Sequence, residues 1–143
     1  MRLVRMIYAS KVTDSVDSSD IKAIADTAVE KNAELGLTGL LCYNGEVFVQ
    51  WLEGPRDAVN ELYATILRDW RHERITILDY SEVDERVFHD WGMGFIPAEE
   101  FGADLVMKYS ASAKFEPFIM SAESVRRFMV EFGSRHRSML DPA

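Results

Sequence analysis

The stretch LTGLLCYNGEVFVQWLEGP, residues 37–55, is typical of a β-hairpin. Residues 37–43 and 46–53 are apolar runs rich in strand-forming residues. The pair Asn44-Gly45 between them is a strong short-range signal for a two-residue hairpin turn. The segment therefore predicts two adjacent antiparallel strands in a fixed register.

The sequence on either side of this hairpin alternates between strand and helix patterns. Residues 3–9 form a short apolar run typical of a strand. A helical spacing of apolar residues then runs from the capping residue types at 18–20 to Gly36, where the helix should end. Pro55 suits a first helical position, and a second helical spacing continues from there to Leu67.

Two further strands, over residues 75–82 and 88–95, complete the predicted sheet. The order βαββαβ with one strand added indicates an α+β fold with a ferredoxin-like sheet and both helices on one face. The last third of the chain has helical patterns, over 104–109 and after the capping residue Ser121. We expect this helical pair to cover the sheet face opposite the first two helices. Residues 98–143 would then be a C-terminal cap of the same domain.

Composition limits the classes of function. The chain has 143 residues, 48% of them apolar, which suits one compact domain. A formal net charge of -8 disfavours nucleic-acid partners. Cys42 is the single cysteine, and the three histidines lie too far apart for metal-ligand spacing, so we expect no disulfide and no metal. We also expect no signal peptide or membrane anchor, and a cytoplasmic location.

Three polar residues fall where apolar ones would be expected. Strand alternation places Gln50 on the same face as Phe48 and Leu52. On the first strand, Tyr8 shares a face with Val4 and Met6, so its phenol could be a partner for Gln50. Asn32 continues the apolar stripe of the first helix. A buried, unpaired amide costs roughly 1–3 kcal/mol, so each of these groups requires a polar partner.

A flat ligand with a polar edge would supply these partners. Ile24 and Ile66, one on each predicted helix, could contact its two faces, and mostly apolar sites with a few polar groups are typical of ligand pockets. Taken singly, a core glutamine or tyrosine is more often a satisfied structural residue. The residues alone therefore indicate a neutral planar ligand between two helices without identifying it.

The sequence resembles the BLUF family, the flavin-binding sensors of blue light. The similarity covers roughly residues 2–96, and several short motifs occur in the right order and spacing. These are Ile7–Ser10, Lys31-Asn32, Leu37–Leu41, Phe48–Gly54, Arg71-His72 and Trp91–Met93. The resemblance implies a photosensory core over residues 1–97, followed by an output segment over 98–143. Gly92 departs from the family pattern, in which many members have serine.

The resemblance also implies FAD as the cofactor and a role for each matching residue. Gln50 would bind the flavin near N5 and O4, Tyr8 would bind Gln50, and Asn32 would bind the polar edge of the ring. Light would then drive electron and proton transfer from Tyr8, leaving Gln50 rotated or in its other tautomer. By the same resemblance, Ile24 and Ile66 would contact the ring faces, and Arg71 and His72 would lie toward the ribityl and phosphate groups. Trp91 or Met93 would relay the signal from Gln50.

The expected function is that of a blue-light photoreceptor without its own catalytic domain. Only about 45 residues follow the core, too few for an independent enzyme, so the output should be contact with a downstream protein. The exposed part of the stripe Phe128, Met129 and Phe132 could support homo-oligomer formation, contact with a separate partner, or both. The alternatives are a ferredoxin-like ligand-binding or protein-interaction module that does not respond to light, and a flavin enzyme, for which no acid–base pair is found.

Overall fold

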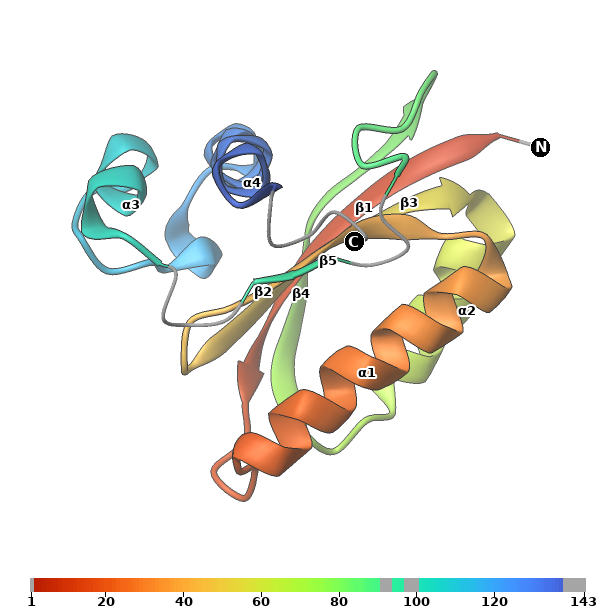
Figure 1. Cartoon of the computed structure of the whole chain (residues 1–143), viewed down its shortest axis with the longest axis horizontal. Helices are drawn as coiled ribbons and strands as arrows, with labels where there is room; N and C mark the ends of the chain where they lie inside the picture. Colours follow the sequence, from red (N-terminus) through yellow and green to blue (C-terminus); the bar gives the residue numbers. More distant parts are fainter. Residues whose placement is uncertain (1, 91–93, 97–100, 138–143) are drawn as a thin grey trace.

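The computed structural model describes residues 2–90, 94–96 and 101–137 of the chain (Figure 1). Five strands form one sheet in the order β4-β1-β3-β2-β5. The elements in chain order are β1 (Leu3–Val12), α1 (Ser18–Leu35), β2 (Thr38–Tyr43), β3 (Val47–Pro55), α2 (Arg56–Leu67), β4 (His72–Val83), β5 (Gly94–Ile96), α3 (Ala103–Tyr109) and α4 (Ala122–Arg135). The predicted α+β, ferredoxin-like architecture is confirmed.

The hairpin of β2 and β3 forms as predicted, but its tip lies one residue later. The Asn44 N–H donates to the Val47 carbonyl, so Gly45 and Glu46 are the two residues at the tip. Gly45 has a φ of 99°, which a side chain would disfavour. The Asn44 side chain accepts from the Glu46 and Val47 amides, at 3.0 and 2.9 Å, and this local bonding moves the turn.

The two helices beside the hairpin begin close to the predicted positions, α1 one to three residues earlier and α2 one residue later. Asp17 caps α1 and forms a reciprocal capping box with Asp20, so the cap precedes the predicted residues 18–20. Gly36 ends α1 in the left-handed conformation, as predicted. Pro55 is the residue before α2 rather than its first helical residue.

The strands after α2 differ most from expectation. β4 begins at His72 instead of residue 75, because it pairs along almost the whole length of β1. The strand predicted over 88–95 is described only at Gly94–Ile96, where β5 pairs in parallel with β2. Phe88 does not extend that strand: its backbone forms a bend, and its side chain is buried in the core. Trp91 and Met93 lie outside the described residues.

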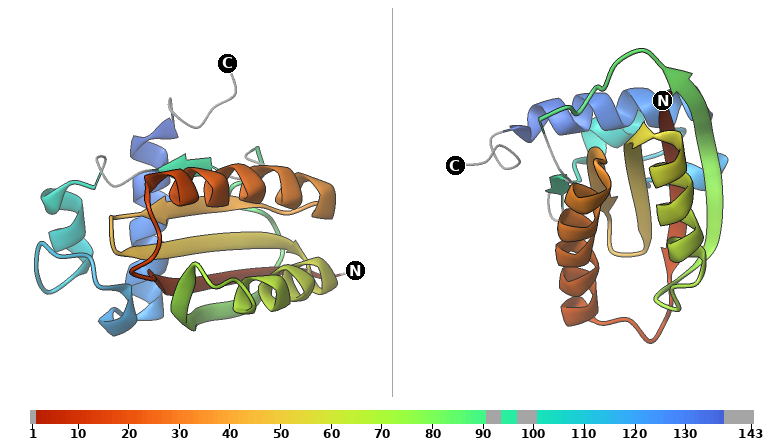
Figure 2. Two further views of the ribbon diagram at one scale, coloured as in Figure 1. Left: turned by 90° about the horizontal axis from the view of Figure 1, so that it is seen from below. Right: turned by 90° about the vertical axis from the view of Figure 1, so that its right-hand side faces the viewer.

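The sheet separates two layers of helices (Figure 2). α1 and α2 lie side by side over one face, where Val4, Met6 and Tyr8 of β1 form part of the core. α4 crosses the opposite face, and α3 lies beside α4 at the hairpin end of the sheet (Figures 1 and 2). Both helices contribute to the core that contains Ile7 and Trp51. The alternation of side chains along β1 and β3 therefore assigns consecutive residues to different cores.

Within the described ranges, every helix is too short or too polar to cross a lipid bilayer.

Candidate functional site

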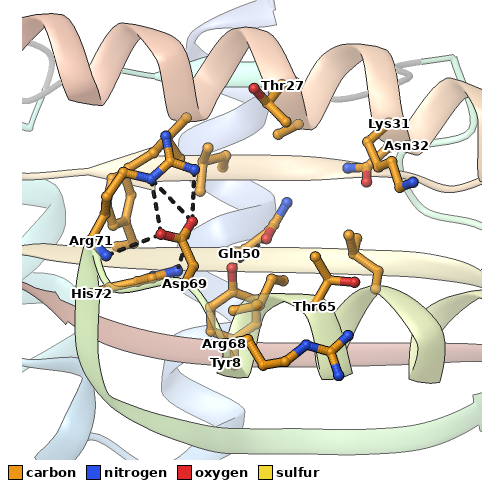
Figure 3. A pocket seen from close by; sticks show the side chains of 16 residues that line it. Tyr8, Thr27, Lys31, Asn32, Gln50, Thr65, Arg68, Asp69, Arg71 and His72 are labelled. Carbon is orange, nitrogen blue, oxygen red and sulfur yellow. Dashed lines mark hydrogen bonds and ion pairs between the residues drawn. The ribbon is translucent and has the colours of Figure 1, made fainter.

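A cavity of about 510 Å³ lies between α1 and α2, and β1 and β3 form its floor. Seven residues singled out in the sequence line this one cavity: Tyr8, Ile24, Asn32, Gln50, Ile66, Arg71 and His72. Figure 3 shows Gln50 between two polar ends, with Arg71, Asp69 and His72 gathered at one end and Lys31 and Asn32 toward the other. The cavity is thus elongated, with apolar walls and polar groups at its floor and ends.

Tyr8 and Gln50 form the floor of the cavity. They are directly opposed in the antiparallel pairing of β1 with β3, which brings their side chains together on the same face. The Tyr8 hydroxyl donates to Gln50 Oε1 at 2.5 Å, and the two residues are 2% and 3% exposed. Burial raises the pKa of Tyr8 well above its usual value, so the phenol keeps its proton at neutral pH.

Asn32 is the least satisfied polar residue of the cavity. It lies near the end of α1, its side chain is fully buried, and neither Nδ2 nor Oδ1 has a hydrogen-bond partner within the part of the chain that the structure describes. An unpaired buried amide costs about 1–3 kcal/mol. Such a residue is explained by a ligand that brings both a donor and an acceptor to this end of the cavity.

Arg71 and Asp69 form an ion pair at the opposite end. The Arg71 Nε atom lies 2.9 and 3.1 Å from the two Asp69 carboxylate oxygens, and Nη2 lies 2.7 Å from Oδ2. Burial alone would raise the pKa of Asp69, but the hydrogen bonds from Arg71 lower it. The guanidinium charge is therefore already balanced by a protein carboxylate, a partner that the sequence reasoning missed.

His72 is buried beside this ion pair, and its burial favours the neutral imidazole. Its Nδ1 lies 2.9 Å from Ser10 Oγ, and its Nε2 lies 3.8 Å from Asp69 Oδ2, too far for a hydrogen bond. Burial lowers the pKa of His72, and this effect outweighs the attraction of Asp69. Asp69 could not be identified beforehand, because it belongs to no periodic pattern or recognised motif. Ser10 ends the motif Ile7–Ser10, but the motif alone indicated no role for its hydroxyl.

The residues present fit a flavin ring. Ile24 from α1 and Ile66 from α2 supply apolar walls on the two sides of the cavity. The unpartnered amide of Asn32 and the amide of Gln50 offer donors and acceptors to the heteroatoms of such a ring, without an opposing charge. Among the described residues, no group of three or more His, Cys, Asp or Glu side chains could hold a metal ion.

Comparisons with known proteins agree with this fit. The family model described as "BLUF: Sensors of blue-light using FAD" matches residues 3–94. Photoactivated adenylate cyclase subunit beta of Euglena gracilis is 40% identical over 86 residues, which is 60% of this chain but only 10% of that protein. The blue light- and temperature-regulated antirepressor BluF of Escherichia coli (strain K12) is 34% identical over 91 residues, covering 64% of this chain and 23% of that protein.

A solved structure extends the similarity beyond the matched segment. The dark-state structure of BlrB, a BLUF protein, aligns with a TM-score of 0.74 and 32% identity. It covers 91% of this chain and 96% of that chain, so the alignment includes most of the C-terminal helical layer. The two curated relatives, in contrast, are much longer than this chain, which spans about a tenth and a quarter of their lengths.

Proposed function

The chain belongs to the BLUF family of blue-light flavin sensors, and we propose that it holds FAD in the cavity between α1 and α2 and signals light absorption to a separate protein. The observation that carries this proposal is the convergence of Tyr8, Gln50 and the unpartnered Asn32 on one apolar cavity. Tyr8 and Gln50 pair with each other there, but the buried Asn32 amide, without a partner among the described residues, is costly in a core that binds nothing.

Five of the residues that line the cavity have a part in binding under this proposal. Asn32 gives its free donor and acceptor to the polar edge of the ring, and Ile24 and Ile66 contact its faces. Arg71 and His72 lie toward the ribityl and phosphate groups. Because the Arg71 charge is shared with Asp69, it positions those groups through directed N–H bonds more than through net charge.

Tyr8 and Gln50 form the switch. A bound flavin would supply the absorption of blue light and an acceptor for one electron and one proton. Tyr8 gives up an electron and its hydroxyl proton and recovers both, while Gln50 is left with its amide rotated or in its other tautomer. Exchanging the donor and acceptor ends of a neutral amide changes the hydrogen bonds on both sides without burying a charge, so either state can persist.

The output is proposed to be contact with another protein in the cytoplasm, with this chain acting as a homo-oligomer. The stripe Phe128, Met129 and Phe132, expected to support oligomer formation, is buried in the core, so the oligomer would form through another surface. The relatives named above are a light-activated cyclase subunit and an antirepressor, so the same sensor module occurs with different outputs. In this chain the layer of α3 and α4 lies against the sheet face opposite the cavity, where a change in β3 can reach it.

Reconstitution with FAD tests the proposal. The purified protein should bind FAD, and its flavin absorption should shift reversibly to the red under blue light. Tyr8→Phe should keep the flavin and lose the shift, because no phenol remains to donate to Gln50. Tyr63→Phe is the matched control, since its ring lies 6.1 Å from that of Tyr8 and it loses the same atom. A protein that cannot bind FAD would overturn the proposal.

A further inference from the structure

A buried carboxylate lies on β3 three residues after Gln50, on the opposite face of the sheet. Glu53 is 1% exposed, and each of its two carboxylate oxygens accepts two hydrogen bonds. Trp51 Nε1 and the Val87 amide each lie 3.0 Å from Oε2, while the Phe88 amide and Thr38 Oγ1 lie 2.5 and 3.3 Å from Oε1. These four donors make burial of the charge tolerable.

Two of these donors come from a distant part of the chain. Val87 and Phe88 follow β4 and lie 34 and 35 residues beyond Glu53 in the sequence. We call residues 86–88 the β4–β5 connection, because they lie between those two strands. The Glu53 carboxylate therefore holds the β4–β5 connection against β3 from inside the core.

Arg86 attaches the same connection to the end of α1. Its Nη2 atom donates to the Gly36 carbonyl at 2.9 Å, and Nη1 donates to Thr38 Oγ1 at 3.0 Å. Gly36 ends α1 four residues after Asn32. The β4–β5 connection is thus hydrogen-bonded to the two elements that carry the cavity amides. It is bonded to β3, which carries Gln50, and to the end of α1, which carries Asn32.

The connection also belongs to the core beneath α4. Phe88 packs edge-on against Trp51, with ring centroids 5.0 Å apart and planes at 82°. Both rings lie in the same buried cluster as Phe128 and Phe132 of α4. A displacement of Phe88 or Trp51 must therefore be accommodated by the α4 layer, because close-packed cores transmit small shifts.

We propose that Glu53 is a positioning residue that passes the state of β3, set at Gln50, to the β4–β5 connection and the α4 layer. The four donors occupy the acceptor sites of both oxygens, so the carboxylate cannot reorient without leaving a buried N–H unpaired. The Val87 and Phe88 amides therefore follow β3 when it moves. This relay adds an exit route for the signal, and only its light-dependent part rests on the proposed function.

Glu53→Gln tests the relay, because glutamine keeps the shape of glutamate but offers one acceptor oxygen and turns an NH2 group toward a donor. In the dark, amide hydrogen exchange at Val87 and Phe88 should rise at least about tenfold. Under blue light, the variant should keep the flavin and its red shift. The light-minus-dark difference in exchange across α4 should fall at least about threefold compared with the wild type.

Two further variants keep the test decisive. Glu46→Gln makes the same chemical change on the same hairpin at a side chain that is 64% exposed, and it should behave as the wild type. Trp51→Phe removes one donor to Glu53 and keeps an aromatic ring. If Glu53→Gln loses its flavin, the light-minus-dark exchange across α4 is measured in Trp51→Phe instead.

Two results would overturn the relay. One is a light-minus-dark difference in hydrogen exchange across α4 that is as large in Glu53→Gln as in the wild type. The other is loss of the red shift while flavin stays bound, which would place Glu53 in the photochemistry itself. If the wild-type protein shows no red shift, the proposed function fails. The dark exchange at Val87 and Phe88 still decides whether Glu53 holds the connection.

Discussion

The two faces of the sheet are built from alternate residues of the same strands but are filled in opposite ways. On the α4 face, Phe128 stacks on Phe115 and Phe132 packs edge-on against Phe101, each pair with ring centroids 4.6 Å apart. On the α1–α2 face, a cavity remains, and the amide of Asn32 has no partner in the described structure. The α4 face is complete by itself, whereas the α1–α2 face is completed by a ligand.

This difference separates residues that stabilise the fold from residues that bind. Aromatic packing on the α4 face removes apolar surface from water, which is the dominant favourable contribution to folding. The unpaired amide of Asn32 on the cavity face does the reverse until a ligand is bound. Substitutions on the two faces should therefore change different measured quantities.

The largest expected effect on stability is on the α4 face. Phe128→Ala should lower the free energy of unfolding by about 3–5 kcal/mol, because it leaves a void in a close-packed aromatic cluster. The folded fraction should bind flavin as the wild type does. Urea unfolding and flavin titration measure the two quantities. Ile119→Ala, at a side chain that is 73% exposed, is the control and should change stability by less than about 0.5 kcal/mol.

The next largest effect is expected at Asn32, where one substitution should stabilise the flavin-free protein but weaken flavin binding. Asn32→Leu should raise the free energy of unfolding of the flavin-free protein by about 1–2 kcal/mol, because it removes two unpaired buried polar atoms. The same change should weaken flavin binding at least about tenfold, which is 1.4 kcal/mol. Asn60→Leu, on the exposed side of α2, is the amide control for flavin affinity. Lower stability of the flavin-free Asn32→Leu protein would contradict this description of the cavity face.

The smallest expected effect is the contribution of His72 to the pH dependence of stability. Burial holds the pKa of His72 below its ordinary value of 6.5, so below that pH the unfolded chain binds a proton that the folded chain does not. The free energy of unfolding should therefore fall as the pH is lowered through 6.5. His72→Gln should flatten this slope, and His89→Gln, which removes an exposed imidazole, is the matched control. Urea unfolding between pH 5 and 8 measures the slopes.

The difference between the faces also explains what could be predicted from the sequence. Tyr8, Gln50 and Asn32 were found because each interrupts an apolar pattern with a neutral polar group, and periodicity fixes the face on which it lies. Glu53 was missed because its donors at Val87 and Phe88 come from a segment whose path no local pattern encodes. Asp69 was missed for the same reason, since a polar loop carries no periodic signal.

The predicted elements show the same limit. The hairpin, α1 and α2 depend on local turn and capping chemistry, and they were located to within about two residues. The longer β4 and the short described part of β5 depend on pairing with β1 and β2, which are far away in the sequence. Long-range pairing adds or removes strand residues without a local signal, so these boundaries were wrong by several residues.

The central claim is that a neutral amide on the cavity face is the light-responsive group. It is tested most directly by the light-minus-dark absorption spectrum of the flavin-loaded protein and of Gln50→Leu. Leucine fills a similar volume but has no amide to reorient. The wild type should show a reversible red shift, and Gln50→Leu should bind flavin and show none. A red shift of normal size and reversal in flavin-bound Gln50→Leu would contradict the role given to Gln50.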